Sequence, residues 1–186
     1  MLNFFSAGNL IRLLLLFHMP FTAFTTYHFY LAATTDDCTL GSIVLAAVFF
    51  LAVCVLAPAY CAWRICTVPS GKLYDATRTL MALGPLYNLY GEGQQRYAAV
   101  LLGSSLVTGL IVGAVQASGT TQAVLLIVVE IVMGLVTMIW LPWGEGASMG
   151  ATTFILGVLR TITLVLVLLL TPAVRPTFAE TFFPGG

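Results

Sequence analysis

The sequence of 186 residues has few charged side chains, seven Lys and Arg against seven Asp and Glu, which together make up 8% of the chain. A soluble domain carries about a quarter charged residues, so this chain could not cover a water-facing surface. Its hydrophobic fraction of 60% and mean hydropathy of +1.02 instead predict an integral membrane protein. Because the formal net charge is zero, there is no basic surplus to neutralise phosphates, and no nucleic-acid partner is expected.

The sequence also lacks the short motifs that mark enzymes and cofactor sites. It contains no glycine-rich dinucleotide motif, no phosphate-binding P-loop and no HExxH zinc motif. Its four cysteines form no CxxC pair, so neither a zinc site nor a disulfide framework is indicated. His18 and His28 lie on one apolar run, whereas two axial ligands of one haem would have to come from opposing helices. We therefore expect a protein that is not an enzyme, with no catalytic residue, no metal and no cofactor.

Five long apolar runs are present, and each is close to the roughly 20 residues that cross a bilayer. They cover residues 10–33, 41–66, 98–117, 122–141 and 151–171. These runs predict an all-α polytopic membrane protein in which residues 1–186 form a single transmembrane bundle of about five helices. Pro20 and Pro58 predict bends in the first two helices, because proline removes one backbone donor. The Pro-rich tail, residues 172–186, is expected to be irregular or to lie on the membrane surface.

The longest polar stretch, residues 67–97, links the second run to the third. Apolar residues at helical spacing predict a short amphipathic helix from Lys72 to Leu83 that lies in the membrane surface. A break at Gly84 and Pro85 is expected to end it. Tyrosines after the break are expected to anchor the chain at the interface, where aromatic residues gather. The interfacial residues are Lys72, Arg78, Gly84, Pro85, Tyr87, Tyr90 and Arg96.

The few basic residues predict the orientation. Four of the seven flank or lie in the polar stretch: Arg64, Lys72, Arg78 and Arg96. The loop expected across the membrane holds Asp36 and Asp37 and no base. Short loops rich in Lys and Arg stay on the cytoplasmic side, so the stretch and the N-terminus are predicted to be cytoplasmic, or to face an organellar matrix. We expect an organellar membrane or an endomembrane rather than the plasma membrane.

Glu130 and Arg160 are charged residues near the centres of the fourth and fifth runs. A charge at such depth costs at least about 2.5–3.5 kcal/mol on insertion scales, so each is expected to have a partner. At about 1.5 Å per residue the two depths match within one side-chain length. We predict an ion pair between adjacent antiparallel helices. It could be a structural lock or part of a transport pathway, and the lock is favoured.

Small residues recur every fourth position along the third run, at Ser105, Gly109, Gly113 and Ala117. Close approach of backbones is the main attraction between helices that lipid surrounds, so this stripe predicts a packing face. Packing within the chain is favoured over contact with a second copy, although a homo-oligomer stays open.

Three segments resemble a known family: KLYDATRTLMALGPLYNLYGEGQQRYAAVLL, VGAVQASGTTQAVLLIVVEIVMGL and GATTFILGVLRTITLVLVLL. Together with Arg12, Leu14–Phe17 and Pro20 in the first run, they are similar to the membrane half of the fungal TRP-like family, the flavin-carrier and polycystin-related proteins. The resemblance covers about residues 10–171. It implies cation conduction, or the handling of flavin nucleotides or lipids. The sequence departs from the family's pattern at both ends, where the secreted domain and early helices, and the last helices, are expected; these departures argue against autonomous transport.

Two functions of different class stay open. The favoured one is a non-catalytic accessory or scaffold subunit of a larger membrane complex, whose partners are the bilayer and other membrane subunits. The alternative is a TRP-like cation channel or a flavin or lipid transporter module. A pore predicts polar residues repeated along one face of a helix, and the sequence shows only isolated ones.

Overall fold

The computed structural model describes residues 2–35, 38–69, 71, 77–91, 93–143 and 148–171. The regular elements of this part are all helical: α1 (Leu2–Thr34), α2 (Leu40–Phe49), the π-helix η1 (Phe50–Leu56), α3 (Ala57–Thr67), α5 (Thr77–Tyr87), α6 (Tyr97–Ala114), α7 (Gly119–Trp140) and α8 (Ser148–Leu169). Five segments are long and apolar enough to cross a membrane: Gly8–Thr34, Leu40–Thr67, Tyr97–Ala114, Gly119–Trp140 and Gly150–Leu169. The predicted all-α, five-span membrane fold is thereby confirmed.

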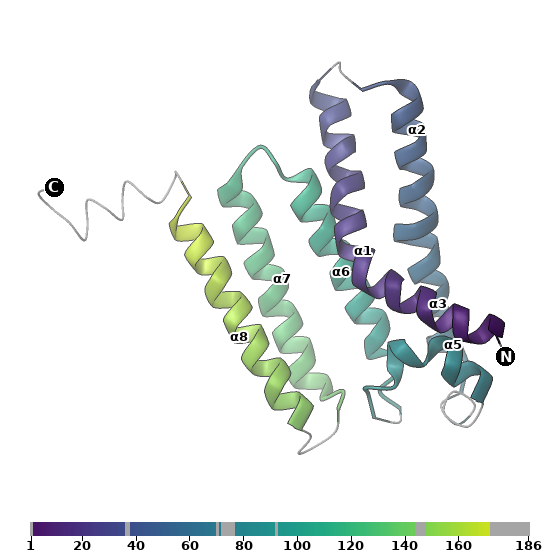
Figure 1. Ribbon diagram of the computed structural model, residues 1–186. Coiled ribbons are helices and arrows are strands. Elements are labelled where there is room, and N and C mark those ends of the chain that lie inside the picture. The colour runs from purple at the N-terminus through teal and green to yellow at the C-terminus, as the bar shows by residue number, and fades with distance from the viewer. Residues whose placement is uncertain are drawn as a thin grey trace, which may run out of the picture.

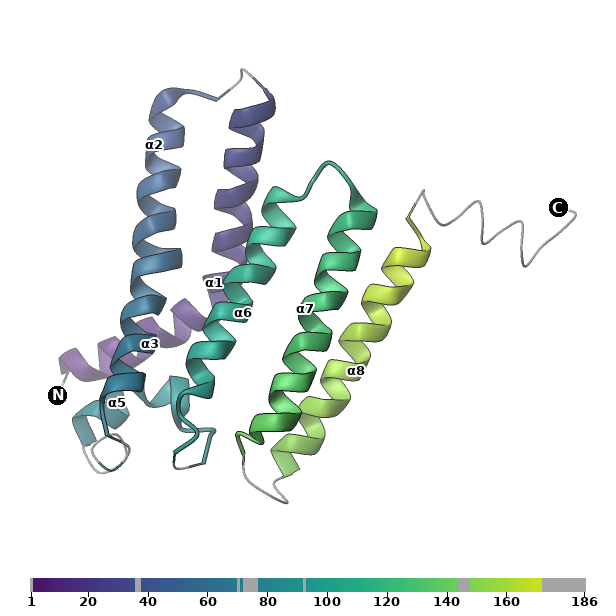
Figure 2. The same ribbon diagram turned by 180° about the vertical axis from the view of Figure 1, so that it is seen from behind.

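Helix α1 begins at Leu2, earlier than the predicted residue 10, and bends sharply near its middle (Figure 1). Pro20 lies inside the helix and cannot donate to the carbonyl of Leu16, which accounts for the bend. The second half runs up through the bundle, whereas the first half lies across its lower end beside α5, as both views show (Figures 1 and 2). The lower end of the bundle therefore carries two helices that do not cross it.

The second span is one continuous rod, Leu40–Thr67, in which α2, η1 and α3 follow one another. In the π-helix η1, backbone N–H groups donate to the carbonyl five residues earlier, instead of four as in an α-helix. The N–H of Ala57, for example, donates to the carbonyl of Ala52. Pro58 follows directly in the first turn of α3. Because Pro58 has no N–H, the carbonyl of Cys54 loses its α-helical donor. Near Pro58, where a bend was predicted, the structure has a π-helical stretch just before the proline.

Helix α5 runs through Gly84 and Pro85 and ends at Tyr87, so the predicted break at these two residues is wrong. Proline costs this helix only one hydrogen bond, the one to Met81, and the next turn closes normally, with Asn88 N–H donating to the Gly84 carbonyl at 2.9 Å. Lys72, at the start of the predicted amphipathic helix, lies outside the described residues.

Helices α7 and α8 form an antiparallel hairpin at one edge of the bundle (Figures 1 and 2). Ser118 caps α7, its hydroxyl accepting from the N–H of Thr121. Leu141, in the left-handed region at φ 45°, ends the helix. The hairpin packs on the rest of the chain through α6, so α8 is the outermost span.

The buried core sits at the lower end, where α3, α5 and α6 meet. It consists of Cys61, Ile65, Leu83, Leu86, Tyr87, Tyr90, Tyr97, Ala98 and Leu102. Aromatic rings extend it to the end of α7, with Tyr97 against Trp140 and Trp143. Burial raises the pKa of Tyr90 to about 12, and the nearby Tyr97 adds to the shift. The lower end is thus an aromatic layer of the kind found at membrane interfaces.

Candidate functional site: polar and charged contacts between the spanning helices

The small-residue stripe of α6 faces the second half of α1. Ser105 lies 3.1 Å from His18, measured from Oγ to Nδ1. A Cβ added at Gly109 would lie 2.6 Å from the Cβ of Thr22, and one added at Gly113 would overlap the side chain of Thr26. Only hydrogen fits at these two glycines, so the backbones of α1 and α6 approach closely. Within the part that the structure describes, this stripe packs inside one chain.

Ala117 does not belong to that packing face. Helix α6 ends at Ala114, and Ala117 lies in the turn before α7. The amide of Gln122 reaches back from α7 and donates to the carbonyl of Val112 at 3.0 Å. Because this donor satisfies a terminal carbonyl of α6, the helix can stop there, three residues before the predicted end.

The complementary stripe on α1 consists of His18, Thr22 and Thr26. From the sequence, His18 was considered only as a haem ligand, and this stripe was not identified. These residues have the same four-residue spacing as Ser105, Gly109 and Gly113. This matching spacing is the sequence pattern that could have identified the α1 side of the contact. The threonine hydroxyls donate within their own helix, Thr22 to the carbonyl of His18 at 2.8 Å and Thr26 to that of Thr22 at 2.7 Å. Because each hydroxyl already has a hydrogen-bond acceptor in its own helix, the stripe can pack against α6 without water between them.

His18 joins three spans and is 1% exposed. Its Nε2 lies 3.0 Å from the carbonyl oxygen of Cys54, the same carbonyl that Pro58 leaves without an α-helical donor. A carbonyl can only accept, so the hydrogen is on Nε2, and in the neutral ring Nδ1 accepts from the Ser105 hydroxyl. The imidazole thus replaces the missing backbone donor of one helix and ties it to two others.

Replacing His18 by leucine is expected to destabilise the bundle by about 1–3 kcal/mol, because the Cys54 carbonyl loses its donor in a buried place. Adding Pro58→Ala returns a backbone N–H and should recover part of the loss. The measurement is the thermal midpoint of the purified protein in mild detergent. His28→Leu is the matched control, since His28 is only partly buried and has a long contact of 3.3 Å to Ser42. An unchanged midpoint for His18→Leu would contradict this assignment.

Glu130 and Arg160 meet across the α7–α8 hairpin. The Oε1 of Glu130 lies 3.3 Å from the Nε of Arg160, and each residue is near the middle of its helix. The two side chains differ in exposure: Glu130 is 18% exposed and Arg160 is 69% exposed. The pair therefore lies near the middle of two spanning helices, and most of the Arg160 side chain is left uncovered by this chain.

Those predicted interfacial residues that the structure describes gather at the lower end. Tyr87 and Tyr90 are in the core, while Gly84 and Pro85 line the side of α5 toward α1. Arg96 is exposed at the start of α6. For Arg78 only the helical backbone is described, and Lys72 lies outside the description. No group of three or more His, Cys, Asp or Glu that could hold a metal occurs among the described residues.

A family model described as "Transient receptor potential (TRP) ion channel" matches residues 2–178. The chain belongs to this family. The match confirms the TRP-like resemblance and identifies the chain as a channel-related integral membrane protein. A family of ion channels also fits the expectation that this TRP-family chain is not an enzyme. No curated protein and no solved structure matches it significantly.

Proposed function

We propose that the chain is a subunit of an oligomeric TRP-type ion-transport assembly, in which the outer side of α8 contacts a neighbouring copy. The observation that carries this proposal is the 69% exposure of Arg160 at the middle of a spanning helix. A cation at that depth is stable only when it faces protein or water instead of lipid. Glu130 covers one side of the guanidinium, so the other side needs a further partner.

The position of α8 supports the same proposal. Helix α8 packs chiefly against α7, and no residue from Gly150 to Leu170 is buried within the chain. Leu156, Arg160, Thr163 and Val167 form an exposed ridge along it. Residues three or four positions apart share one side of a helix. A neighbour on this ridge would cover Arg160 and its apolar surroundings together.

Photocrosslinking of the purified chain in liposomes tests this contact. A benzophenone amino acid at Leu156 or Thr163 should give an adduct of twice the 19.9 kDa of one chain. Ile155 and Ile162 are matched controls, because they are exposed but point about 100° around α8 from Leu156 and Thr163, and they should give little adduct. Equal adducts at all four positions, or none on the ridge, would refute the contact.

A second candidate is a non-catalytic accessory or scaffold subunit of a larger complex. Its support is that the polar side chains between the spans are already satisfied: His18 by Cys54 and Ser105, and the α1 threonines by their own helix. The interface between α1, η1 and α6 therefore has no continuous row of free polar groups along which ions could pass. In this case the partner on the α8 ridge is a different membrane protein.

The orientation and compartment are also proposals. Arg12, Arg64 and Arg96 all belong to elements at the lower end of the bundle, and the positive-inside tendency supports placing this end, with the N-terminus, on the cytoplasmic or matrix side. An organellar membrane or endomembrane is the expected location. Protease protection of an N-terminal tag in sealed vesicles would test the orientation.

A further inference from the structure

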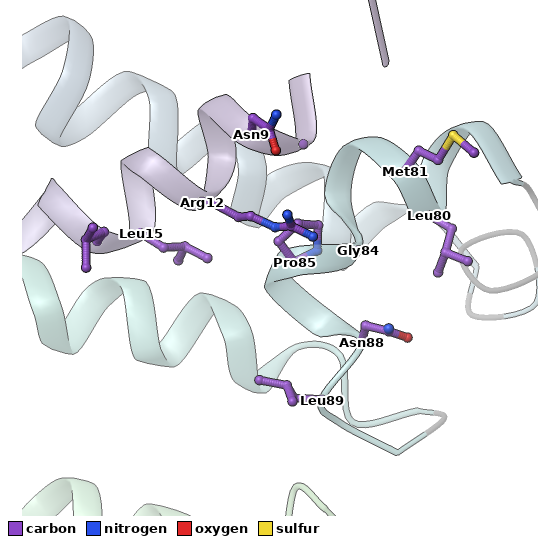
Figure 3. A pocket seen from close by; sticks show the side chains of 11 residues that line it. Asn9, Arg12, Leu15, Leu80, Met81, Gly84, Pro85, Asn88 and Leu89 are labelled. Atoms are coloured by element: carbon purple, nitrogen blue, oxygen red, sulfur yellow. The ribbon is translucent and has the colours of Figure 1, made fainter. Parts of the chain in front are cut away.

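The spanning segments stand side by side in a row, which ends on one side at α8 and on the other at the second span, Leu40–Thr67 (Figures 1 and 2). The second span packs on α1 and, lower down, on α6, while α6 packs on α7 and α7 on α8. The first half of α1 and α5 pack against each other at the lower end (Figure 3) and leave α8 and α2 uncovered. The row therefore has two open edges.

The α8 edge carries an excess of hydrogen-bond donors. Arg160 lies at the midpoint of the span Gly150–Leu169, and the Oε1 of Glu130 faces its Nε at 3.3 Å. A guanidinium has five N–H donors and accepts nothing. Because the Arg160 side chain is largely exposed, most of these donors need acceptors from outside the chain.

The opposite edge carries a backbone acceptor without a donor in its own helix. In an α-helix the carbonyl of Val53 would accept from the N–H of Ala57, but that N–H donates to Ala52. In a π-helix it would accept from residue 58, which is Pro58 and has no N–H. Val53 is partly exposed. A carbonyl that lipid surrounds costs several kcal/mol when it is left unbonded, so this one also needs an outside partner.

The donor and the acceptor lie at the same depth. Val53 is at the midpoint of the second span, as Arg160 is at the midpoint of its own. An apolar span centres on the hydrocarbon core, so both groups come to the middle of the bilayer. Leu51, Ala52 and Leu56 are exposed around Val53, and α2 above it has no buried residue. This edge therefore offers an uncovered apolar surface around its free carbonyl.

Contacts between like edges do not meet these needs. Two α8 ridges facing each other would bring two Arg160 cations together at one depth, where the low dielectric strengthens their repulsion. Two second spans facing each other would leave Arg160 uncovered. A contact between unlike edges gives the arginine an acceptor and the carbonyl a charged donor, and such hydrogen bonds are among the strong ones.

We propose that the α8 ridge of one copy packs against η1 of the next copy, with the guanidinium of Arg160 donating to the carbonyl of Val53. The inference rests on the proposed assembly of copies and names the surface that the ridge meets. A contact between unlike edges repeats from copy to copy, and it generates a closed ring when the rotation between copies closes.

A benzophenone amino acid at Thr163, used in liposomes of the full chain, locates the partner surface. The adduct of twice the mass of one chain is digested, and its crosslinked peptides are identified by mass spectrometry. We expect the second peptide to come from residues 45–60 of the other copy. An adduct that joins α8 to α8 or to α7 would overturn this inference and leave the proposed contact between copies intact, whereas absence of the adduct would overturn both.

Pro58→Ala tests the acceptor itself. His18 already donates to the Cys54 carbonyl, so the N–H that alanine returns is free for Val53. We expect association, measured by energy transfer between labelled copies on dilution in liposomes, to weaken roughly tenfold, as for one lost charge-assisted hydrogen bond. Pro69→Ala is the matched control, because Pro69 is exposed just beyond the span.

The control should associate like the wild type. Folded Pro58→Ala protein that associates as tightly as the wild type, or equal weakening by Pro69→Ala, would overturn the role of the Val53 carbonyl. If Pro58→Ala does not fold, the peptide that the Thr163 crosslink identifies decides the matter.

Discussion

Gly113→Leu is expected to abolish the folded bundle. A side chain at position 113 would occupy the space of the Thr26 side chain and of the Ala23 carbonyl, and backbone atoms of α1 cannot move aside without separating the helices. Overpacking of a well-packed interior already costs about 1–3 kcal/mol, and here the obstacle is largely backbone, so the loss should reach or exceed the upper end of that range. Size-exclusion chromatography in mild detergent should show aggregate in place of a monodisperse peak.

Gly103→Leu is the control for Gly113→Leu. Gly103 lies in the same helix α6, but nothing stands within 4 Å of a Cβ built there. It is exposed on the outer side of the bundle. The substitution makes the same change in composition and should leave the peak and the thermal midpoint nearly unchanged. Equal damage by both substitutions would mean that leucine harms α6 in general and that the α1–α6 contact is not decisive.

Glu130→Gln is expected to have the second largest effect. It leaves Arg160 as an unpaired cation at the middle of α8, where a charge costs about 2.5–3.5 kcal/mol on insertion scales. We expect lower yield and a loss of stability of about 2 kcal/mol, because the long arginine side chain can still reach toward the interface. Thermal unfolding in detergent and the amount of inserted protein measure the two effects.

The double substitution Glu130→Gln with Arg160→Leu separates folding from assembly. Removing both charges should restore yield and stability to near the wild type, because no isolated charge remains in the span. If Arg160 contacts a neighbouring subunit, the double variant should still lose the crosslink on the α8 ridge. Equal stability of the single and double variants would show that the two residues do not act as a pair.

Periodicity and hydropathy were sufficient to predict the five spans, because an apolar run of about 20 residues has few alternatives in a membrane. The ends of elements were predicted less well. Gly84 and Pro85 were predicted to break the helix, yet α5 continues to Tyr87. Pro85 leaves only one carbonyl unbonded, that of Met81, and this carbonyl lies against Gly8 of α1. Gly8 is far away in the sequence, and no local pattern reports such a contact.

The same limit applies to the contacts between helices. A small-residue stripe on α6 and two intramembrane charges are visible in the sequence as local patterns. The role of His18 is not, because it depends on a carbonyl that Pro58 frees in another helix and on Ser105 in a third. The exposure of Arg160 is likewise a property of the packed bundle, since it depends on which side of α8 turns away from α7.

Ion flux into liposomes containing only the purified chain is the most direct test of an ion-transport assembly. The liposomes are loaded with a cation-sensitive dye, and the protein is first shown to be oligomeric by its mass in mild detergent. The proposal predicts cation entry that rises with protein content and falls when the α8 ridge is disrupted by Arg160→Leu with Glu130→Gln. Liposomes that stay as tight as empty ones, although the oligomer is intact, would contradict it and leave the scaffold function in its place.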